Sequence, residues 1–242
     1  LHEPGILRGL VESHHYSFSD VVVIHQKCEA ANYPLFNYPC TTIDLPREEF
    51  DPLLTRFGIN PDNLRAEELS HGEGAAHWWK AHVVNIIKGL EFTTADYMVF
   101  ADCDTKMVGQ PPDRSWVEEG IYLLDAYPHV LIVGPGDGGE AGGTCAEGGK
   151  LPNGARLTRN VSQQLFICRG EQFRHDVDFD VPWDGVPDAP GGPMIEFYIM
   201  AEGRISLYMR KTKQWRAILP DRWRYWHNSF WATDREAEGW RR

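Results

Sequence analysis

Short runs of β-branched and apolar residues alternate with helical segments along the first 133 residues, and this alternation constrains the fold more than any other feature. Four runs have the length and composition of buried strands, at residues 20–25, 41–45, 95–101 and 129–133. Within 72–90 the apolar residues recur at i, i+3, i+4 and i+7, and a further helix is predicted at 115–126. This order of strands and helices predicts an α/β domain with a mostly parallel central sheet flanked by helices.

The second half of the chain has weaker signals. Residues 134–149 contain eight glycines, so they predict a flexible loop. We expect a strand at 163–168, a helix at 194–201 that ends near Gly203, and another strand at 205–210. Since the chain has neither an internal repeat nor a clear linker, we interpret residues 1–242 as one domain.

Composition and charge exclude several classes of function. The net charge of −11 disfavours a protein that binds nucleic acid through phosphate contacts, and it also disfavours anchoring to anionic membranes. Apolar runs stay well short of 18 residues, and the start has no signal-peptide pattern, so no integral membrane segment is predicted. The nine tryptophans indicate either rings that stack on sugars or bases, or a tryptophan-rich core.

The five cysteines are scattered along the chain, and their pattern indicates the redox state of the compartment in which the protein works. They are odd in number and form no CxxC pair, which argues against a disulfide framework and against a cysteine-type zinc site. Their pattern favours a reducing compartment, so a cytoplasmic location is expected. The lumen of the secretory pathway is the alternative if a targeting segment has been removed.

The strongest candidate for chemistry is Asp102-Cys103-Asp104, which directly follows a buried strand. Ligands of parallel sheets bind beyond the carboxyl ends of the strands, and carboxylates at i and i+2 can point into one crevice. Carboxylate oxygens of this kind suit Mg²⁺ or Mn²⁺, which in turn can bind a diphosphate. Alternatively, the aspartates only cap the end of the strand.

The segment from His77-Trp78-Trp79-Lys80 through a helix to the strand before Asp102-Cys103-Asp104 resembles the core of the GT-A glycosyltransferases. In that family a helix with an early Lys or Arg precedes an apolar strand that ends in a DxD motif, and this motif binds the metal and the nucleotide sugar. The resemblance covers about residues 70–105 and continues loosely through 196–203 and the segment around His227.

The resemblance implies a GT-A-like, Rossmann-type sandwich and an enzyme that moves a sugar from a nucleotide-diphosphate sugar to an acceptor hydroxyl with Mn²⁺ or Mg²⁺. Residues 1–133 would form the nucleotide-sugar-binding half and 134–242 the acceptor-binding half. Two departures stand out. A helical segment precedes the first strand, and the QxxRW motif of processive synthases is missing because Gln214-Trp215-Arg216 has the wrong spacing. Polymer synthesis is therefore not indicated.

Lys80 and Glu196 are the next candidates. Lys80 lies near the apolar stripe of its helix, so its ammonium either extends to water or meets an anion such as the donor diphosphate. Glu196 opens a largely apolar segment, where the helix dipole alone would favour a carboxylate. In inverting GT-A enzymes a similarly placed acid is the general base, and apolar neighbours can raise its pKa toward that role.

Three residues near the end of the chain complete the expected site. His227 follows several aromatic residues and is interpreted either as a packed, hydrogen-bonded residue or as the third metal ligand, with His71 as its competitor. An imidazole beside two carboxylates would favour Mn²⁺ over Mg²⁺. Trp223 and Trp226 would stack on an acceptor sugar or close the core.

Two other functions remain open at this point. A nucleotidyltransferase would also place acidic metal ligands at strand ends, although the chain lacks a glycine-rich, basic phosphate loop after its first strand. A non-catalytic carbohydrate-binding or scaffold protein would use the tryptophans and would need neither metal nor nucleotide.

Overall fold

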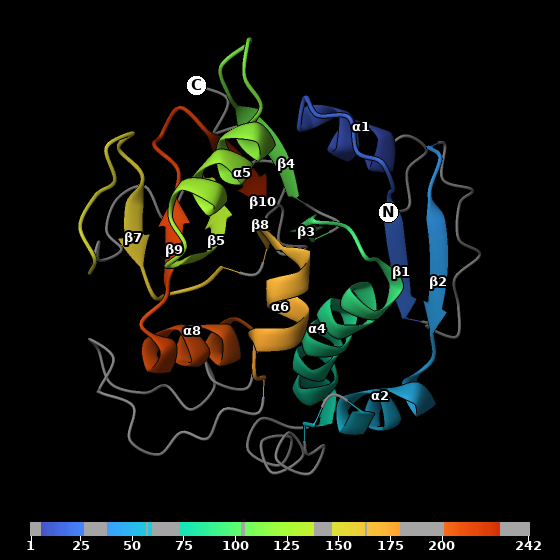
Figure 1. Ribbon diagram of the computed structural model, residues 1–242. Coiled ribbons are helices and arrows are strands. Elements are labelled where there is room, and N and C mark those ends of the chain that lie inside the picture. Colours follow the sequence, from blue (N-terminus) through green and yellow to red (C-terminus); the bar gives the residue numbers. More distant parts are fainter. Residues whose placement is uncertain are drawn as a thin grey trace.

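A computed structural model of the chain gives a mixed α/β fold (Figure 1). The structure describes residues 6–26, 38–56, 58–59, 73–102, 105–137, 147–162, 164–179 and 201–227. In chain order the elements are α1 (Ile6–Ser13), β1 (Val22–Gln26), β2 (Thr41–Leu45), the 3-10 helix η1 (Arg47–Glu49), α2 (Phe50–Arg56), α4 (Glu73–Phe92), β3 (Tyr97–Ala101), β4 (Thr105–Gly109), α5 (Trp116–Ala126), β5 (Val130–Gly134), β6 (Gly136–Asp137), β7 (Arg156–Thr158), β8 (Leu165–Arg169), α6 (Gly170–Asp176), α8 (Ala201–Thr212), β9 (Trp215–Ile218) and β10 (Arg224–His227).

The largest sheet is mixed, whereas the sequence predicts a mostly parallel one. Its strand order is β3-β8-β5-β9-β7, and of its pairings only β5 with β9 is parallel. A parallel pairing of β5 with β8 would require a crossover, usually through a helix. The described residues between these two strands contain no helix, and β8 runs antiparallel to both of its neighbours.

This sheet is buried on both faces. Successive residues of β8 belong alternately to two hydrophobic clusters, and β5 contributes residues to both of them. Ile132 and Phe166 pack into the cluster with residues of α4, α6 and α8, whereas Val133 and Ile167 pack into the cluster with residues of α5. Burial on both faces explains why β5 reads as an uninterrupted apolar run.

Hydrogen bonds to side chains fix the start of helix α5. The Ser115 hydroxyl accepts a hydrogen bond from the Val117 N–H at 3.1 Å, and the Glu118 carboxylate accepts one from the Ser115 N–H at 3.0 Å. This capping box satisfies two N–H groups that would otherwise lack partners. The helix then packs on β5 and β8, where Gly120 lies against Ile167.

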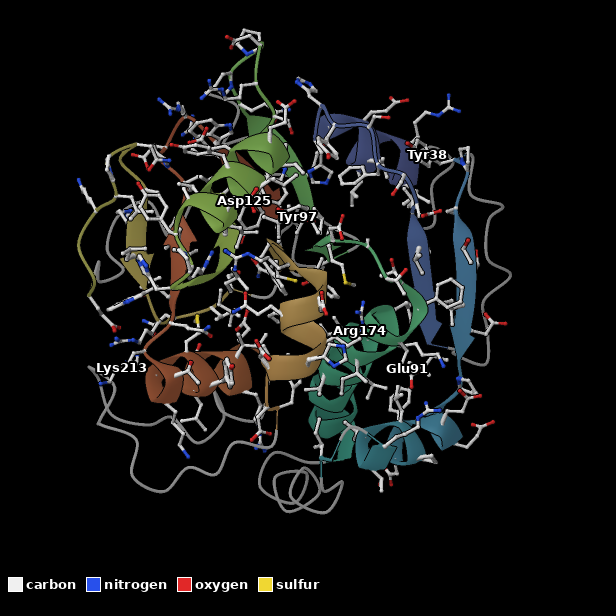
Figure 2. All side chains as sticks on the ribbon, in the orientation of Figure 1. Tyr38, Glu91, Tyr97, Asp125, Arg174 and Lys213 are labelled. Carbon is white, nitrogen blue, oxygen red and sulfur yellow. The ribbon has the colours of Figure 1, made fainter. Side chains whose placement is uncertain are left out.

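Helix α4 carries the predicted apolar stripe, with Val83, Ile86, Ile87 and Leu90 all buried. Arg174 of α6 closes the end of this helix. Its Nε donates to the Leu90 carbonyl at 3.0 Å, and its Nη2 donates to the carbonyl of Thr93. Figure 2 labels Arg174 next to α4. The guanidinium therefore supplies partners to carbonyls that a helix terminus leaves free.

The predicted strand at 205–210 is wrong, because these residues belong to helix α8. Residues 205–209 are all buried, so the segment shows no polar face and loses the periodicity that identifies a helix. The predicted helix end near Gly203 is also wrong, since Gly203 is buried inside α8. The predicted helix at 194–201 lies outside the described residues apart from Ala201.

Two smaller sheets flank the central one. Strands β1 and β2 form a parallel pair beside α4, and Figure 1 shows them at one edge of the molecule. The second small sheet has the order β4-β10-β6, with β10 antiparallel to β4 and parallel to β6. The first strand of this second sheet, β4, begins directly after Asp102-Cys103-Asp104 in the chain.

Candidate functional site at the end of strand β3

Asp102 follows the last residue of β3 and is fixed through its main chain. Its N–H donates to the Gln164 carbonyl at 2.8 Å. Its own carbonyl accepts from the Thr105 N–H at 3.0 Å and from the Thr105 hydroxyl at 2.7 Å. Thr105 is buried and begins β4. Both ends of the connection between β3 and β4 are therefore held, while residues 103 and 104 within it lie outside the described residues.

Strand β10 brings the end of the described chain to this connection. In its register with β4, His227 pairs with Thr105 and Tyr225 pairs with Met107. Tyr225 also pairs with Asp137, the last residue of β6. Because β10 ends where β4 begins, the backbone of His227 lies beside the residue that follows Asp104. One edge of the small sheet thus carries the start of β4 and the carboxyl ends of β10 and β6.

A partly buried hydrogen-bond network joins β10 to Asp102. The Tyr225 hydroxyl donates to Gln164 Oε1 at 2.8 Å and lies 3.2 Å from the Ser162 hydroxyl. Tyr225 is only 1% exposed. The carbonyl of Gln164 also accepts from the Asp102 N–H, so Gln164 contacts both Asp102, which follows β3, and Tyr225 in β10. Ser162, Gln164 and Tyr225 were not predicted from the sequence, because nothing local distinguishes them from other polar residues in or beside a strand.

Helix α1 supports the other side of β4. The Met107 N–H donates to the Ser13 hydroxyl at 3.2 Å, and Gln110 Nε2 donates to the Ser13 carbonyl at 2.7 Å. The next residue, His14, is buried, and its Nδ1 accepts from Trp116 Nε1 at 2.8 Å. Burial lowers the pKa of His14 from 6.5 to about 4, so its ring is neutral at physiological pH.

Most of the residues predicted to form the site have side chains outside the described part of the structure. Asp104 and Glu196 lie outside it entirely, as does the competitor His71. Lys80 is described only as a backbone position in α4, and Trp226 and His227 only as positions in β10. Residues 138–146 of the predicted glycine-rich loop are also outside the described residues.

Trp223 is described in full, and its position corresponds to the core alternative. Its side chain is 0% exposed and belongs to the hydrophobic cluster beneath α5. The guanidinium of Arg222 lies 4.0 Å from the centre of its ring. A ring that stacks on an acceptor sugar must be accessible, so we do not assign Trp223 to acceptor binding.

The predicted donor set matches a divalent transition metal in its chemistry. Two carboxylates and one imidazole suit Mn²⁺ better than Mg²⁺, and the register of β10 places the backbone of His227 opposite Thr105, whose N–H donates to the Asp102 carbonyl. Asp102 is the single predicted ligand whose side chain the structure describes. Among the described residues, no group of three or more His, Cys, Asp or Glu side chains could hold a metal ion.

Comparisons with known proteins add no assignment. The sequence matches no protein-family model, and a search of curated proteins returns no match. Among the described helices, none combines the length and the apolar character that crossing a membrane requires.

Proposed function

We propose that this protein is a metal-dependent glycosyltransferase of the GT-A type, which moves a sugar from a nucleotide-diphosphate donor to an acceptor hydroxyl with inversion. The observation that carries the proposal is the pairing of His227 with Thr105, directly after Asp102-Cys103-Asp104. This pairing joins segments far apart in the sequence at the carboxyl end of β3.

In this proposal each residue has a distinct task. Asp102, Asp104 and His227 would hold the ion, and Lys80 would bind the donor diphosphate. The ion would offset the negative charge that develops on the departing diphosphate. Glu196 would accept the proton of the acceptor hydroxyl as its oxygen bonds to the anomeric carbon and the bond to the diphosphate breaks. Trp226 would contact the acceptor.

Ligand-dependent thermal stability tests the donor and metal parts of the proposal. A panel of nucleoside diphosphates is expected to raise the melting temperature with Mn²⁺ present and not with EDTA. Asp104→Asn should abolish this shift. Asp96→Asn is the matched control, because Asp96 is an exposed aspartate just before the other end of β3. A nucleotide shift that survives EDTA or Asp104→Asn would overturn the metal assignment.

The role of Glu196 requires a rate measurement. Glu196→Gln should lower kcat by roughly 10²–10⁴ while donor binding changes little, as expected for the loss of a general base. A near-normal kcat would assign Glu196 to helix capping. Two further outcomes point to the other functions: stabilisation by free sugars without metal or nucleotide indicates a carbohydrate-binding protein, and release of diphosphate from a nucleoside triphosphate indicates a nucleotidyltransferase.

A further inference from the structure

We infer that Gln164 and Tyr225 are positioning residues that set the Asp102 arm and the His227 arm of the metal site relative to each other. This inference rests on the proposed function, and it assigns neither residue to direct contact with the metal or the substrate. The two arms come from different sheets, since Asp102 follows β3 of the five-stranded sheet and His227 ends β10 of the three-stranded sheet.

Gln164 touches both arms through different atoms. Its carbonyl accepts from the main-chain N–H of Asp102 at 2.8 Å, and its Oε1 accepts from the Tyr225 hydroxyl at 2.8 Å. Tyr225 lies two residues before His227 on the same strand. A change at the Tyr225 hydroxyl therefore alters how β10 is held against the segment that fixes Asp102. The pairing of β10 with β4 does not involve Gln164, so by itself it does not join β10 to the residue that accepts from the Asp102 N–H.

Tyr225 and Ser162 of this network are buried, whereas Gln164 is half-buried. The exposure of Tyr225 is 1% and that of Ser162 is 7%. Because Tyr225 is buried, its hydroxyl depends on protein partners, and the bond to Gln164 restricts the position of β10. Residues that orient metal ligands without touching the ion are a regular part of metal sites, and their replacement typically costs about 10–100-fold in metal affinity.

Ser162 offers a matched control within the same network. It interacts with the same Tyr225 hydroxyl, so Ser162→Ala removes one buried hydrogen bond but leaves the bond from Tyr225 to Gln164 intact. A purely structural network predicts that Ser162→Ala and Tyr225→Phe both lower thermal stability and that neither changes metal affinity. A positioning role predicts that only loss of the Gln164–Tyr225 bond changes the affinity for the metal.

The experiment is a titration with Mn²⁺ alone, followed by the electron paramagnetic resonance signal of the free ion. The proteins are wild type, Tyr225→Phe, Gln164→Asn, Ser162→Ala and Asp104→Asn, each with its melting temperature measured. Tyr225→Phe and Gln164→Asn should raise the apparent Kd for Mn²⁺ by about 10–100-fold, whereas Ser162→Ala should stay within about threefold of wild type. Gln164→Asn keeps the main-chain carbonyl and only withdraws the side-chain acceptor, so it carries the test if Tyr225→Phe does not fold.

Two results would overturn the inference, and they are distinguishable. If Asp104→Asn abolishes Mn²⁺ binding but Tyr225→Phe and Gln164→Asn bind like wild type, the positioning role is wrong and the proposed metal site stands. If the wild-type protein does not bind Mn²⁺, both the proposed metal site and the proposed positioning role are wrong. An equal weakening by Ser162→Ala and Tyr225→Phe would also overturn the inference, because it would show a general loss of rigidity.

Discussion

Mild acid is expected to destabilise the fold through His14, the buried histidine between α1 and the start of α5. The pKa of His14 falls from 6.5 to about 4 on folding because burial penalises the imidazolium form. The neutral Nδ1 accepts from Trp116 Nε1 at 2.8 Å, and the ring packs edge-on against Phe18. A proton on Nδ1 would remove this acceptor and place a charge in an apolar setting.

The sign and magnitude follow from proton linkage. Between pH 6.5 and about pH 4, His14 of the unfolded chain binds a proton that His14 of the folded chain does not bind. The free energy of unfolding therefore rises with pH across this range. Lowering the pH from above 6.5 to below about 4 should remove about 3 kcal/mol, since each pKa unit corresponds to about 1.4 kcal/mol. About 2 kcal/mol of this should already be lost near pH 5.

Urea unfolding monitored by tryptophan fluorescence at a series of pH values measures the effect. The comparison variant is His14→Asn, whose side chain can still offer Trp116 an acceptor but does not titrate. Its own replacement cost is the same at every pH, so the difference in slope between the two proteins isolates His14. Parallel loss of stability in both proteins between about pH 7 and 5, or an NMR-measured His14 pKa near the ordinary value of 6.5, would refute the argument.

Four substitutions test the packing and the helix ends by chemical denaturation. In Gly120→Ala the new Cβ would lie 2.6 Å from Ile167 Cγ2, and overpacking should outweigh the gain in helix propensity, for a net loss of about 1 kcal/mol. Gly9→Ala in α1 meets nothing within 4 Å and should instead stabilise by up to about 1 kcal/mol; equal signs for the two would contradict this account. Lys213 has a φ of 60° after α8, so Lys213→Gly should stabilise by a few tenths of a kcal/mol to about 1. Arg174→Met keeps the aliphatic stem but leaves the end of α4 uncapped, and it should cost about 1–3 kcal/mol, whereas an unchanged midpoint would show that water replaces the guanidinium.

Elements with a local signal were predictable from the sequence. The helix α5 has both halves of a capping box at Ser115 and Glu118, and β5 is a short apolar run between His129 and Gly134-Pro135. The wrong strand at 205–210 shows the limit of this approach. Residues 205–209 are all buried, so apolar and polar residues do not alternate along the segment with the period of a helix. The sequence pattern therefore does not distinguish a helix from a strand there.

The candidate site was predictable only in part. Asp102 could be placed after a strand because the strand is apolar and the aspartate ends it. Neither the antiparallel direction of β8 nor the pairing of β10 with β4 has a local signature, since both depend on contacts between distant segments. The two hydrogen bonds of Gln164 to Asp102 and Tyr225 have no local signal for the same reason, since both partners lie far away in the chain.

The central place of β10 in its small sheet has a consequence for the order of synthesis. Strands β4 and β6 do not pair with each other, because β10 lies between them. A growing chain therefore completes both strands long before their shared partner is translated. Until then the inner edge of β4 exposes N–H and carbonyl groups that could pair with another nascent chain. Exposed edges of this kind promote aggregation during folding, so the last described strand is also the one that removes this hazard.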